Sequence, residues 1–158
     1  MYIGVDGCQD GWVAVVYDEN EYSTTKLYET VNQLWEDYAG VAETILIDIP
    51  IGLREDTKEK RPCDAKAREL LSPKRHSSVF PAPVRAAVHE DNYTDAKETQ
   101  EHKTDGSLGV QSWGIADKIA ELDTFLRETE PDATGRIREA HPEVCLWALN
   151  GKEATSFS

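Results

Sequence analysis

Long apolar runs, paired cysteines and basic residues are scarce in this chain of 158 residues. No stretch approaches eighteen consecutive apolar residues, which excludes a membrane-spanning helix. The three cysteines, Cys8, Cys63 and Cys145, form no C-x-x-C pair, which argues against a zinc ribbon and a disulfide scaffold. We therefore expect three reduced thiols that are buried or half-buried. Because the chain starts with a strand pattern and not with a basic segment, we expect no secretory signal and a cytoplasmic location.

The charge balance is the strongest signal in the composition. Asp and Glu number 30 against 17 Lys and Arg, which gives a net charge of -13. The electrostatic field of a protein with this negative charge repels nucleic acid at long range. Two interpretations stay open. Either the protein never contacts polyanions, or its acidic surface is an adaptation to salt and the site chemistry is local. The single methionine and the excess of Asp, Glu and Thr over Lys favour a halophilic origin.

The apolar pattern of the first fifty residues predicts an α/β fold. Apolar runs over 2–5, 12–17 and 44–49 predict strands, and the last of these does not alternate, so we expect it to be buried on both faces. Residues 23–28 alternate weakly and predict a third antiparallel strand. Thr30 is placed to cap a helix that ends at Gly40. The order strand, strand, strand, helix, strand indicates a mixed sheet.

The rest of the chain divides into an irregular part and a regular part. Prolines punctuate residues 50–110, which we expect to be an insertion within a single domain that spans 1–158. Inside it, the polar window 89–109 predicts a mobile excursion without regular structure. The remaining expected elements are a helix over 63–71, a helix over 111–128, a strand over 136–140 and a helix over 142–149.

Acidic residues stand at the C-terminal ends of three of the expected strands. Asp6 and Asp48 end the first and fourth strands, and Glu139 ends the last one, with Glu143 close behind. Carboxylates that meet at one sheet edge repel one another, and Mg²⁺ or Mn²⁺ would relieve that repulsion. A pair of such ions is the apparatus of phosphodiester hydrolysis. In the alternative interpretation Asp6 is an ordinary turn residue, whereas Asp48 needs a partner or ligand because its strand is expected to be buried.

Cations and hydroxyls gather in two neighbouring segments of this otherwise acidic chain. One is the expected helix over 63–71, where charged residues recur near i, i+3 and i+7. The other is K-R-H-S-S at 74–78, which prolines at 81 and 83 stiffen. Together they predict a local phosphate or anion site. The candidate substrate-binding residues are Arg61, Asp64, Arg68, Arg75, Ser77, Ser78 and His141.

Six ordered motifs resemble those of the DUF429 family, described as predicted nucleases of ribonuclease H-like fold. They cover residues 3 to about 151 and are G-V-D-G-C-x-D-G-W, I-D-I-P-I-G-L, R-x-C-D-x-x-A-R, S-S-V-F-P-A-P-x-R, Q-x-W-x-I-x-x-K-I-x-x-x-D and E-x-H-P-E. The resemblance implies a ribonuclease H-like mixed sheet in which Asp6 and Asp48 bind metal and Glu139 and Glu143 lie near the fifth strand. Family members continue into a further C-terminal helix with an acid, so we expect a C-terminally truncated member.

The leading functional hypothesis is a Mg²⁺- or Mn²⁺-dependent phosphodiesterase that acts on nucleic acid. The catalytic residues would be Asp6, Asp48, Glu139 and Glu143, the first three of them metal ligands. The main alternative is a non-enzymatic ribonuclease H-like scaffold that binds a small anion or a protein partner. In that case Arg61, Arg68 or Arg75 satisfies the acids, and the charged helix face is otherwise merely solvated. For the loop over 74–85, the alternative to a phosphate site is that Arg75 or Arg85 neutralises Asp48 or Glu139 across the sheet edge. A third hypothesis, phosphoryl transfer, lacks the glycine-rich nucleotide loop that would support it.

Overall fold

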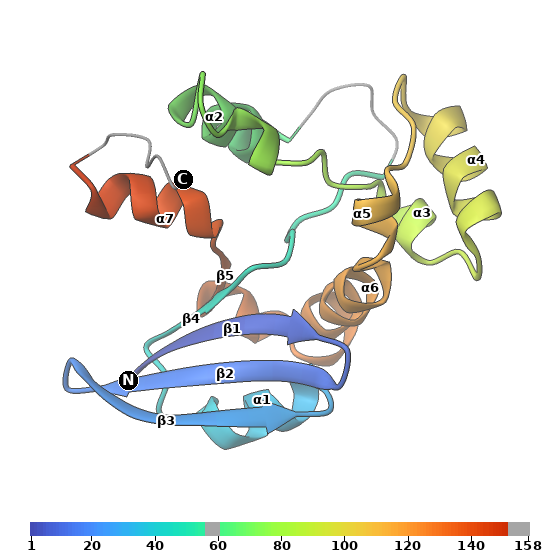
Figure 1. Ribbon diagram of the computed structural model, residues 1–158. Helices are drawn as coiled ribbons and strands as arrows, with labels where there is room; N and C mark the ends of the chain where they lie inside the picture. The colour runs from blue at the N-terminus through green and yellow to red at the C-terminus, as the bar shows by residue number, and fades with distance from the viewer. Residues whose placement is uncertain (56–60, 152–158) are drawn as a thin grey trace. The chain divides into compact units, whose positions relative to one another are not determined.

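The computed structural model describes residues 1–55 and 61–151 (Figure 1). The chain forms two compact units. The first unit comprises Met1–Ile51 and Glu121–Ala140, and the second comprises Gly52–Ala120 and His141–Ser158. The end of the chain that we expect to be truncated, residues 152–158, lies outside the described residues.

The first unit is built on a five-stranded mixed sheet with the order β3-β2-β1-β4-β5. Its strands are β1 (Tyr2–Cys8), β2 (Gly11–Asp18), β3 (Glu21–Tyr28), β4 (Thr44–Ile47) and β5 (Ile137–Glu139). The first three strands are antiparallel, and β4 and β5 run parallel to β1 and to each other. The predicted α/β class and mixed sheet are thereby confirmed, and the strand order is consistent with a ribonuclease H-like arrangement.

The β1–β2 hairpin depends on one glycine. Cys8 pairs with Gly11, so only two residues form the turn. Gly11 has φ +136°, and a Cβ at this position would lie 1.9 Å from the carbonyl oxygen of Tyr28 on β3. No L side chain fits both conditions, so the glycine is required where the three strands meet.

One face of the sheet forms the core of the first unit. Helix α1 (Val31–Tyr38) begins at Thr30, whose Oγ1 accepts a hydrogen bond from the Gln33 backbone N–H at 3.3 Å, as the sequence predicts. The buried Trp12 indole of β2 donates to the Glu121 carboxylate at 3.0 Å, and that carboxylate also accepts from the Val31 backbone N–H at 2.7 Å. Through Glu121, the start of α1 and the start of β2 are tied to the segment that precedes β5.

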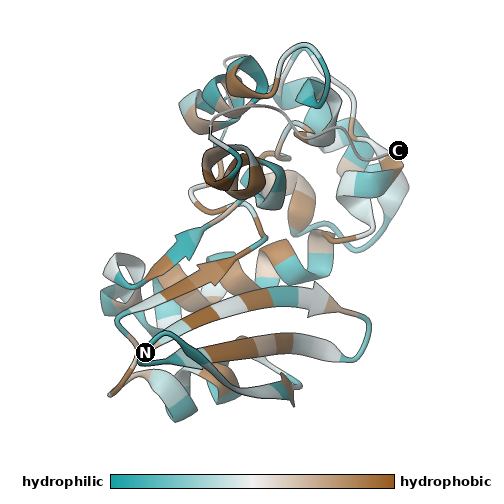
Figure 2. Ribbon diagram, turned by 60° about the vertical axis from the view of Figure 1, so that its left-hand side comes forward, coloured by the Kyte–Doolittle hydropathy of each residue, from teal (hydrophilic) through white to brown (hydrophobic). Residues whose placement is uncertain are grey.

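The opposite face of the sheet is exposed, which corrects one expectation. Buried and exposed residues alternate along β1 and β4, with Ile3 and Val5, or Ile45 and Ile47, on the core face. Figure 2 shows the strands coloured by hydropathy, with brown hydrophobic stretches along several of them. The fourth strand is therefore not buried on both faces. Its apolar run misled us because Leu46 lies on the exposed face despite its side-chain type.

The second unit is helical. Its elements are α2 (Pro62–Leu70), α3 (Arg85–Val88), α4 (Tyr93–Lys103), α5 (Val110–Trp113) and α7 (Pro142–Leu149). Helix α4 contradicts the prediction of an irregular excursion over 89–109. Asn92 Oδ1 caps it by accepting from the Asp95 backbone N–H at 3.1 Å, and Ala96 and Gln100 are buried one turn apart. The polar composition of the remaining helix surface concealed this pattern.

The long helix expected over 111–128 is interrupted. Helix α5 ends at Trp113, α6 (Ala116–Thr124) follows after Gly114, and a π-helical turn covers Phe125–Thr129. No helix in the described residues is long and apolar enough to cross a membrane. All three cysteines are free thiols, as expected, but only Cys8 is half-buried; Cys63 and Cys145 are exposed, contrary to the prediction.

Candidate functional site

Asp6 and Asp48 lie at neighbouring positions on adjacent parallel strands. Val5 pairs with Ile47, and the Asp48 backbone N–H donates to the Val5 carbonyl at 3.1 Å, so the register continues by one residue. Backbones of neighbouring strands lie about 4.8 Å apart. Strand alternation gives both aspartates the exposed face, and both are exposed. We call Asp6 and Asp48 the acid pair.

Two details of the acid pair differ from expectation. Asp6 does not end its strand, because β1 continues to Cys8 through backbone pairing with β2. Asp48 follows the last residue of β4 and is exposed, so the expected penalty for burying its charge does not arise. The case for Asp48 as a functional residue therefore depends on its position beside Asp6 and not on burial.

Glu139 lies one register position away from the acid pair. It pairs with Ile47, and by alternation it shares the face of Ile137 and not that of Asp6 and Asp48. Its Oε2 accepts a hydrogen bond of 2.8 Å from the Ile51 backbone N–H. Through this hydrogen bond Glu139 fixes the position of the backbone at Ile51, three residues after Asp48. Its role as a metal ligand stays a prediction.

The acid pair fits one hard cation better than two. Carboxylate oxygens suit Mg²⁺ or Mn²⁺, and Mg²⁺ is commonly held by one or two carboxylates, with water and substrate phosphate completing its shell. Within residues 1–55 and 61–151, no group of three or more His, Cys, Asp or Glu side chains is arranged to hold a metal ion. The chemistry of the two donors therefore fits a single ion that substrate helps to bind.

The expected anion-binding residues divide into two groups, both within the second unit. In the first group Arg75 forms an ion pair with Glu143 at 3.5 Å, and His141 Nε2 lies 3.3 Å from the Ser78 carbonyl oxygen. The Ser78 hydroxyl donates to the Arg75 carbonyl at 2.7 Å, and Ser77 is exposed. Two buried atoms of this group, His141 Nδ1 and Glu143 Oε2, have no hydrogen-bond partner in the described structure.

The contacts of the first group bear on whether Arg75 binds phosphate or forms a structural ion pair. Arg75 forms an ion pair with Glu143, an acid of the same unit, while neutralisation of Asp48 or Glu139 by Arg75 or Arg85 stays a prediction. Arg85 likewise pairs with Glu55 and donates to the Leu53 carbonyl at 3.1 Å. Both arginines thus have structural contacts within the second unit, which weakens the proposal that Arg75 is a dedicated phosphate ligand.

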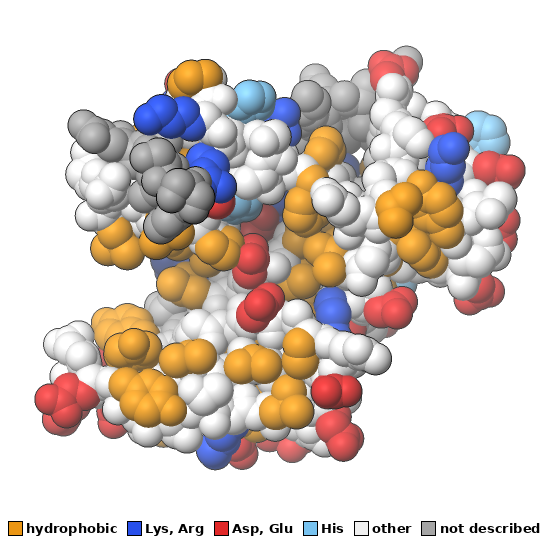
Figure 3. All heavy atoms as spheres, viewed as in Figure 1, with side chains coloured by type: hydrophobic (Ala, Val, Ile, Leu, Met, Phe, Trp, Pro, Cys, Tyr) orange, Lys and Arg blue, Asp and Glu red, His pale blue; other side chains and the backbone are white. Residues whose placement is uncertain are grey.

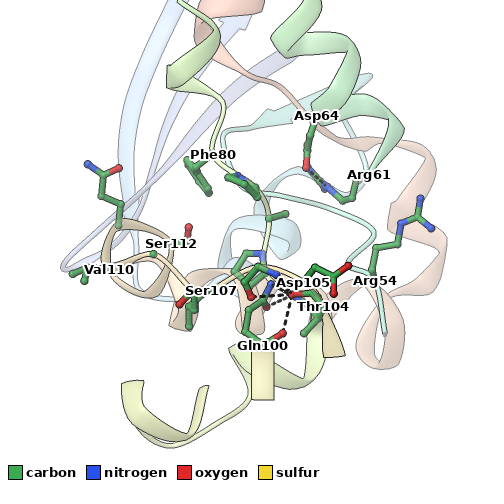
Figure 4. A pocket seen from close by; sticks show the side chains of 18 of the residues that line it. Arg54, Arg61, Asp64, Phe80, Gln100, Thr104, Asp105, Ser107, Val110 and Ser112 are labelled. Carbon is green, nitrogen blue, oxygen red and sulfur yellow. Dashed lines mark hydrogen bonds and ion pairs between the residues drawn. The ribbon is translucent and has the colours of Figure 1, made fainter. Parts of the chain in front are cut away.

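The second group lines a cavity of about 560 Å³ in the second unit (Figure 4). Arg61, Asp64 and Arg68 all contribute to its wall, so the predicted spacing along α2 does bring them to one place. We call this space the arginine cavity. Sequence analysis missed the residues that complete it, among them Arg54, Gln100 and Ser112, because they come from distant segments. Ser112 lies within one of the six motifs, but nothing local indicates that it is buried.

A comparison with protein families decides the relationship. Residues 4–158 match the family model described as "Protein of unknown function (DUF429)". The chain belongs to the DUF429 family. No curated protein and no solved structure matches it. The match confirms the resemblance given by the six motifs, and it extends over both the acid pair and the arginine cavity. Because the DUF429 description names no activity, function has to be argued from these two sites.

Proposed function

We propose that this DUF429 protein is a metal-dependent phosphodiesterase that acts on nucleic acid. The observation that carries the proposal is the acid pair: two exposed carboxylates at neighbouring positions of two parallel strands, in a sheet of ribonuclease H-like order. Exposed like charges so close together favour a bound cation. Mg²⁺ or Mn²⁺ held there would supply an activated water and stabilise the leaving oxygen.

The protein's own residues have distinct parts in this proposal. Asp6 and Asp48 hold the cation, and the backbone hydrogen bond between Asp48 and Val5 fixes their relative position. Glu139 accepts from the Ile51 backbone and so positions the segment that follows Asp48. Asp6 lies within β1 and Asp48 directly follows β4, where its backbone hydrogen bond to Val5 ties it to β1; groups held by rigid elements are better defined than groups on loops, which supports a catalytic role for the acids.

Three tyrosines on the same face of the sheet favour a nucleic-acid substrate. Tyr2 pairs with Tyr17 and Tyr17 with Tyr22, so the three side chains form a row across β1, β2 and β3. They are 50%, 46% and 61% exposed, respectively. Figure 3 shows hydrophobic side chains gathered over these strands. Unpaired bases stack on exposed aromatic rings of sheets, and the row lies about 13 Å along β1 from Asp6, or roughly two nucleotides away.

The experiment compares Asp6→Asn and Asp48→Asn with the parent protein. Parent protein should cleave a labelled single-stranded oligonucleotide in Mn²⁺, and Mn²⁺ should raise its melting temperature because the ion binds the native state. Each substitution should abolish cleavage and the Mn²⁺-dependent shift. Asp18→Asn, the same change at an exposed position of β2, is the matched control and should retain both. Cleavage that survives in either acid-pair variant would refute the proposal.

A further inference from the structure

The arginine cavity has the size and composition of a small-molecule site. Its volume of about 560 Å³ lies within the usual range for ligand pockets, roughly 300–1,000 Å³. Such pockets combine apolar walls with a few convergent polar groups. All the described residues of its wall belong to the second unit, whereas the acid pair belongs to the first. The cavity is therefore a second candidate site, and its argument does not depend on the proposed phosphodiesterase activity.

The charge of the wall is the reverse of the charge of the whole chain. Its charged members are three arginines and two aspartates, in a protein of net charge -13. Arg61 and Asp64 are 6% and 8% exposed and form a bidentate pair in which Arg61 Nε lies 3.0 Å from Asp64 Oδ2. A buried pair of this kind neutralises itself and holds its geometry. It provides a fixed polar wall. Outside this pair, the charged residues described in the wall are Arg54, Arg68 and Asp105, and Arg68 is the cation on which the case for an anionic ligand rests.

Arg68 has hydrogen-bonding capacity beyond its structural contact. Within the described residues its half-buried guanidinium donates one hydrogen bond, from Nη1 to the Val79 carbonyl. A guanidinium carries five N–H donors in a planar fork. The contact with Val79 fixes the orientation of that fork, and the remaining donors suit a carboxylate or phosphate group.

Ser112 contributes a hydroxyl group to the wall of the cavity. The residue is 5% exposed, lines the cavity, and its hydroxyl has no hydrogen bond to any described residue. The hydroxyl oxygen is not among the fully buried unpartnered atoms of the described residues, which are His141 Nδ1 and Glu143 Oε2, so it can be reached from the cavity. Gln100, by contrast, is engaged, because its Oε1 accepts from the buried Val84 backbone N–H at 2.9 Å. Ser112 thus offers a hydroxyl on the cavity wall to which a ligand can hydrogen-bond.

The rest of the wall is apolar and includes one aromatic ring. Figure 4 shows Phe80, Val110 and Ser112 along one side of the view and the Arg61–Asp64 pair along the other. The wall's apolar members among the described residues include Phe80, Pro81, Pro83 and Val84. A phenyl ring and proline rings offer flat surfaces on which a planar group can stack.

We propose that the arginine cavity binds a small organic anion that consists of a ring with one phosphate or carboxylate group. The anionic group lies against Arg68 and the Ser112 hydroxyl, and the ring lies against Phe80 and its proline neighbours. An inorganic anion alone would leave the apolar wall uncovered. A neutral ring alone would leave Arg68 and Ser112 without their partner. The two parts of the ligand are therefore both required.

Isothermal titration calorimetry with four probes tests this proposal on the full chain. Adenosine 5′-monophosphate and benzoate carry a ring with a phosphate or a carboxylate, while adenosine and inorganic phosphate carry one part each. At least one ring-bearing anion should bind with a Kd below about 1 mM, and adenosine and phosphate should bind at least about tenfold more weakly. The proposal is wrong if neither ring-bearing anion binds, or if inorganic phosphate binds as tightly as they do.

Substitutions then locate the binding. Arg68→Met should weaken binding by about tenfold or more, and Ser112→Ala by roughly threefold. Arg138→Met, which removes an exposed arginine of β5 in the first unit, is the matched control and should bind like the parent. If Arg68→Met fails to fold because the Val79 contact is lost, Ser112→Ala decides, since its hydroxyl holds no described hydrogen bond. Unchanged affinity in Ser112→Ala together with a folded Arg68→Met that binds normally would overturn the assignment.

Discussion

Replacing Gly11 with alanine should be among the most damaging single changes in the first unit. The backbone at Gly11 has φ +136°, a region that L side chains rarely occupy, and the new Cβ would lie 1.9 Å from the Tyr28 carbonyl oxygen. Backbone strain of this kind costs about 1–3 kcal/mol. A backbone oxygen cannot rotate aside as a side chain can, so β3 must shift as well. Losing one hydrogen bond of the β2–β3 ladder adds roughly 1 kcal/mol.

These contributions predict a loss of about 3 kcal/mol in the free energy of unfolding for Gly11→Ala. Urea unfolding followed by tryptophan fluorescence measures it, because Trp12 and Trp35 both belong to the first unit. Gly4→Ala is the matched control. Gly4 lies on the neighbouring strand, and a Cβ there meets nothing within 4 Å, so the change should stay within about 0.5 kcal/mol. If Gly11→Ala lost no more than Gly4→Ala, the argument from the close approach of β3 would be wrong.

Two further predictions concern the tyrosines of the sheet. The Tyr28 hydroxyl lies 2.8 Å from Asp37 Oδ2, a contact that lowers the pKa of Asp37 below its ordinary value of 3.8, while burial raises the pKa of Tyr28 above 10.0. The stabilisation that ionised Asp37 contributes is therefore present above about pH 4 and is lost as pH falls. The stabilisation from the neutral Tyr28 hydroxyl is lost as pH rises above 10. The difference in melting temperature between the parent and Tyr28→Phe should therefore be larger at pH 7 than at pH 3. In the exposed row of tyrosines, the double change Tyr17→Ala and Tyr22→Ala should weaken binding of a single-stranded oligonucleotide by about tenfold, measured by fluorescence anisotropy. The Mn²⁺-dependent shift in melting temperature should stay unchanged. If the double variant binds the oligonucleotide as tightly as the parent, the row is not part of the proposed substrate site.

The strands of the first unit could be predicted because each depends on a short local pattern. The errors occur where that pattern is interrupted. Asp6 was expected to end β1, but Gly7 and Cys8 continue the pairing with Trp12 and Gly11 of β2. A hairpin turn of two residues requires this pairing, and the turn becomes visible only when both strands are considered together. Helix α4 was missed for the complementary reason: it buries little apolar surface, and its cap at Asn92 is a stronger signal than its hydropathy.

The two candidate sites differ in how much of them the sequence can predict. The acid pair follows from strand register, which brings together the residues one step beyond Val5 and Ile47. The arginine cavity combines α2 with Phe80 and Ser112, residues whose proximity depends on tertiary packing. Spacing along α2 could place Arg61, Asp64 and Arg68 on one side of the helix, but it could not show that Arg61 and Asp64 are buried as a pair.

The acidic composition and a nucleic-acid substrate are compatible if stacking, not charge, provides most of the affinity. Proteins that bind through Lys and Arg release counterions, so their affinity falls steeply as salt rises. A protein of net charge -13 starts from repulsion, which salt screens, while the contribution of Tyr2, Tyr17 and Tyr22 through base stacking is retained. Its affinity for a single strand should therefore be level or rise with salt, which is the opposite of the usual slope. A level or rising affinity would show that the acidic surface is compatible with the proposed activity, whereas a steep fall with salt would show that Lys and Arg contacts dominate binding and would refute the argument from stacking.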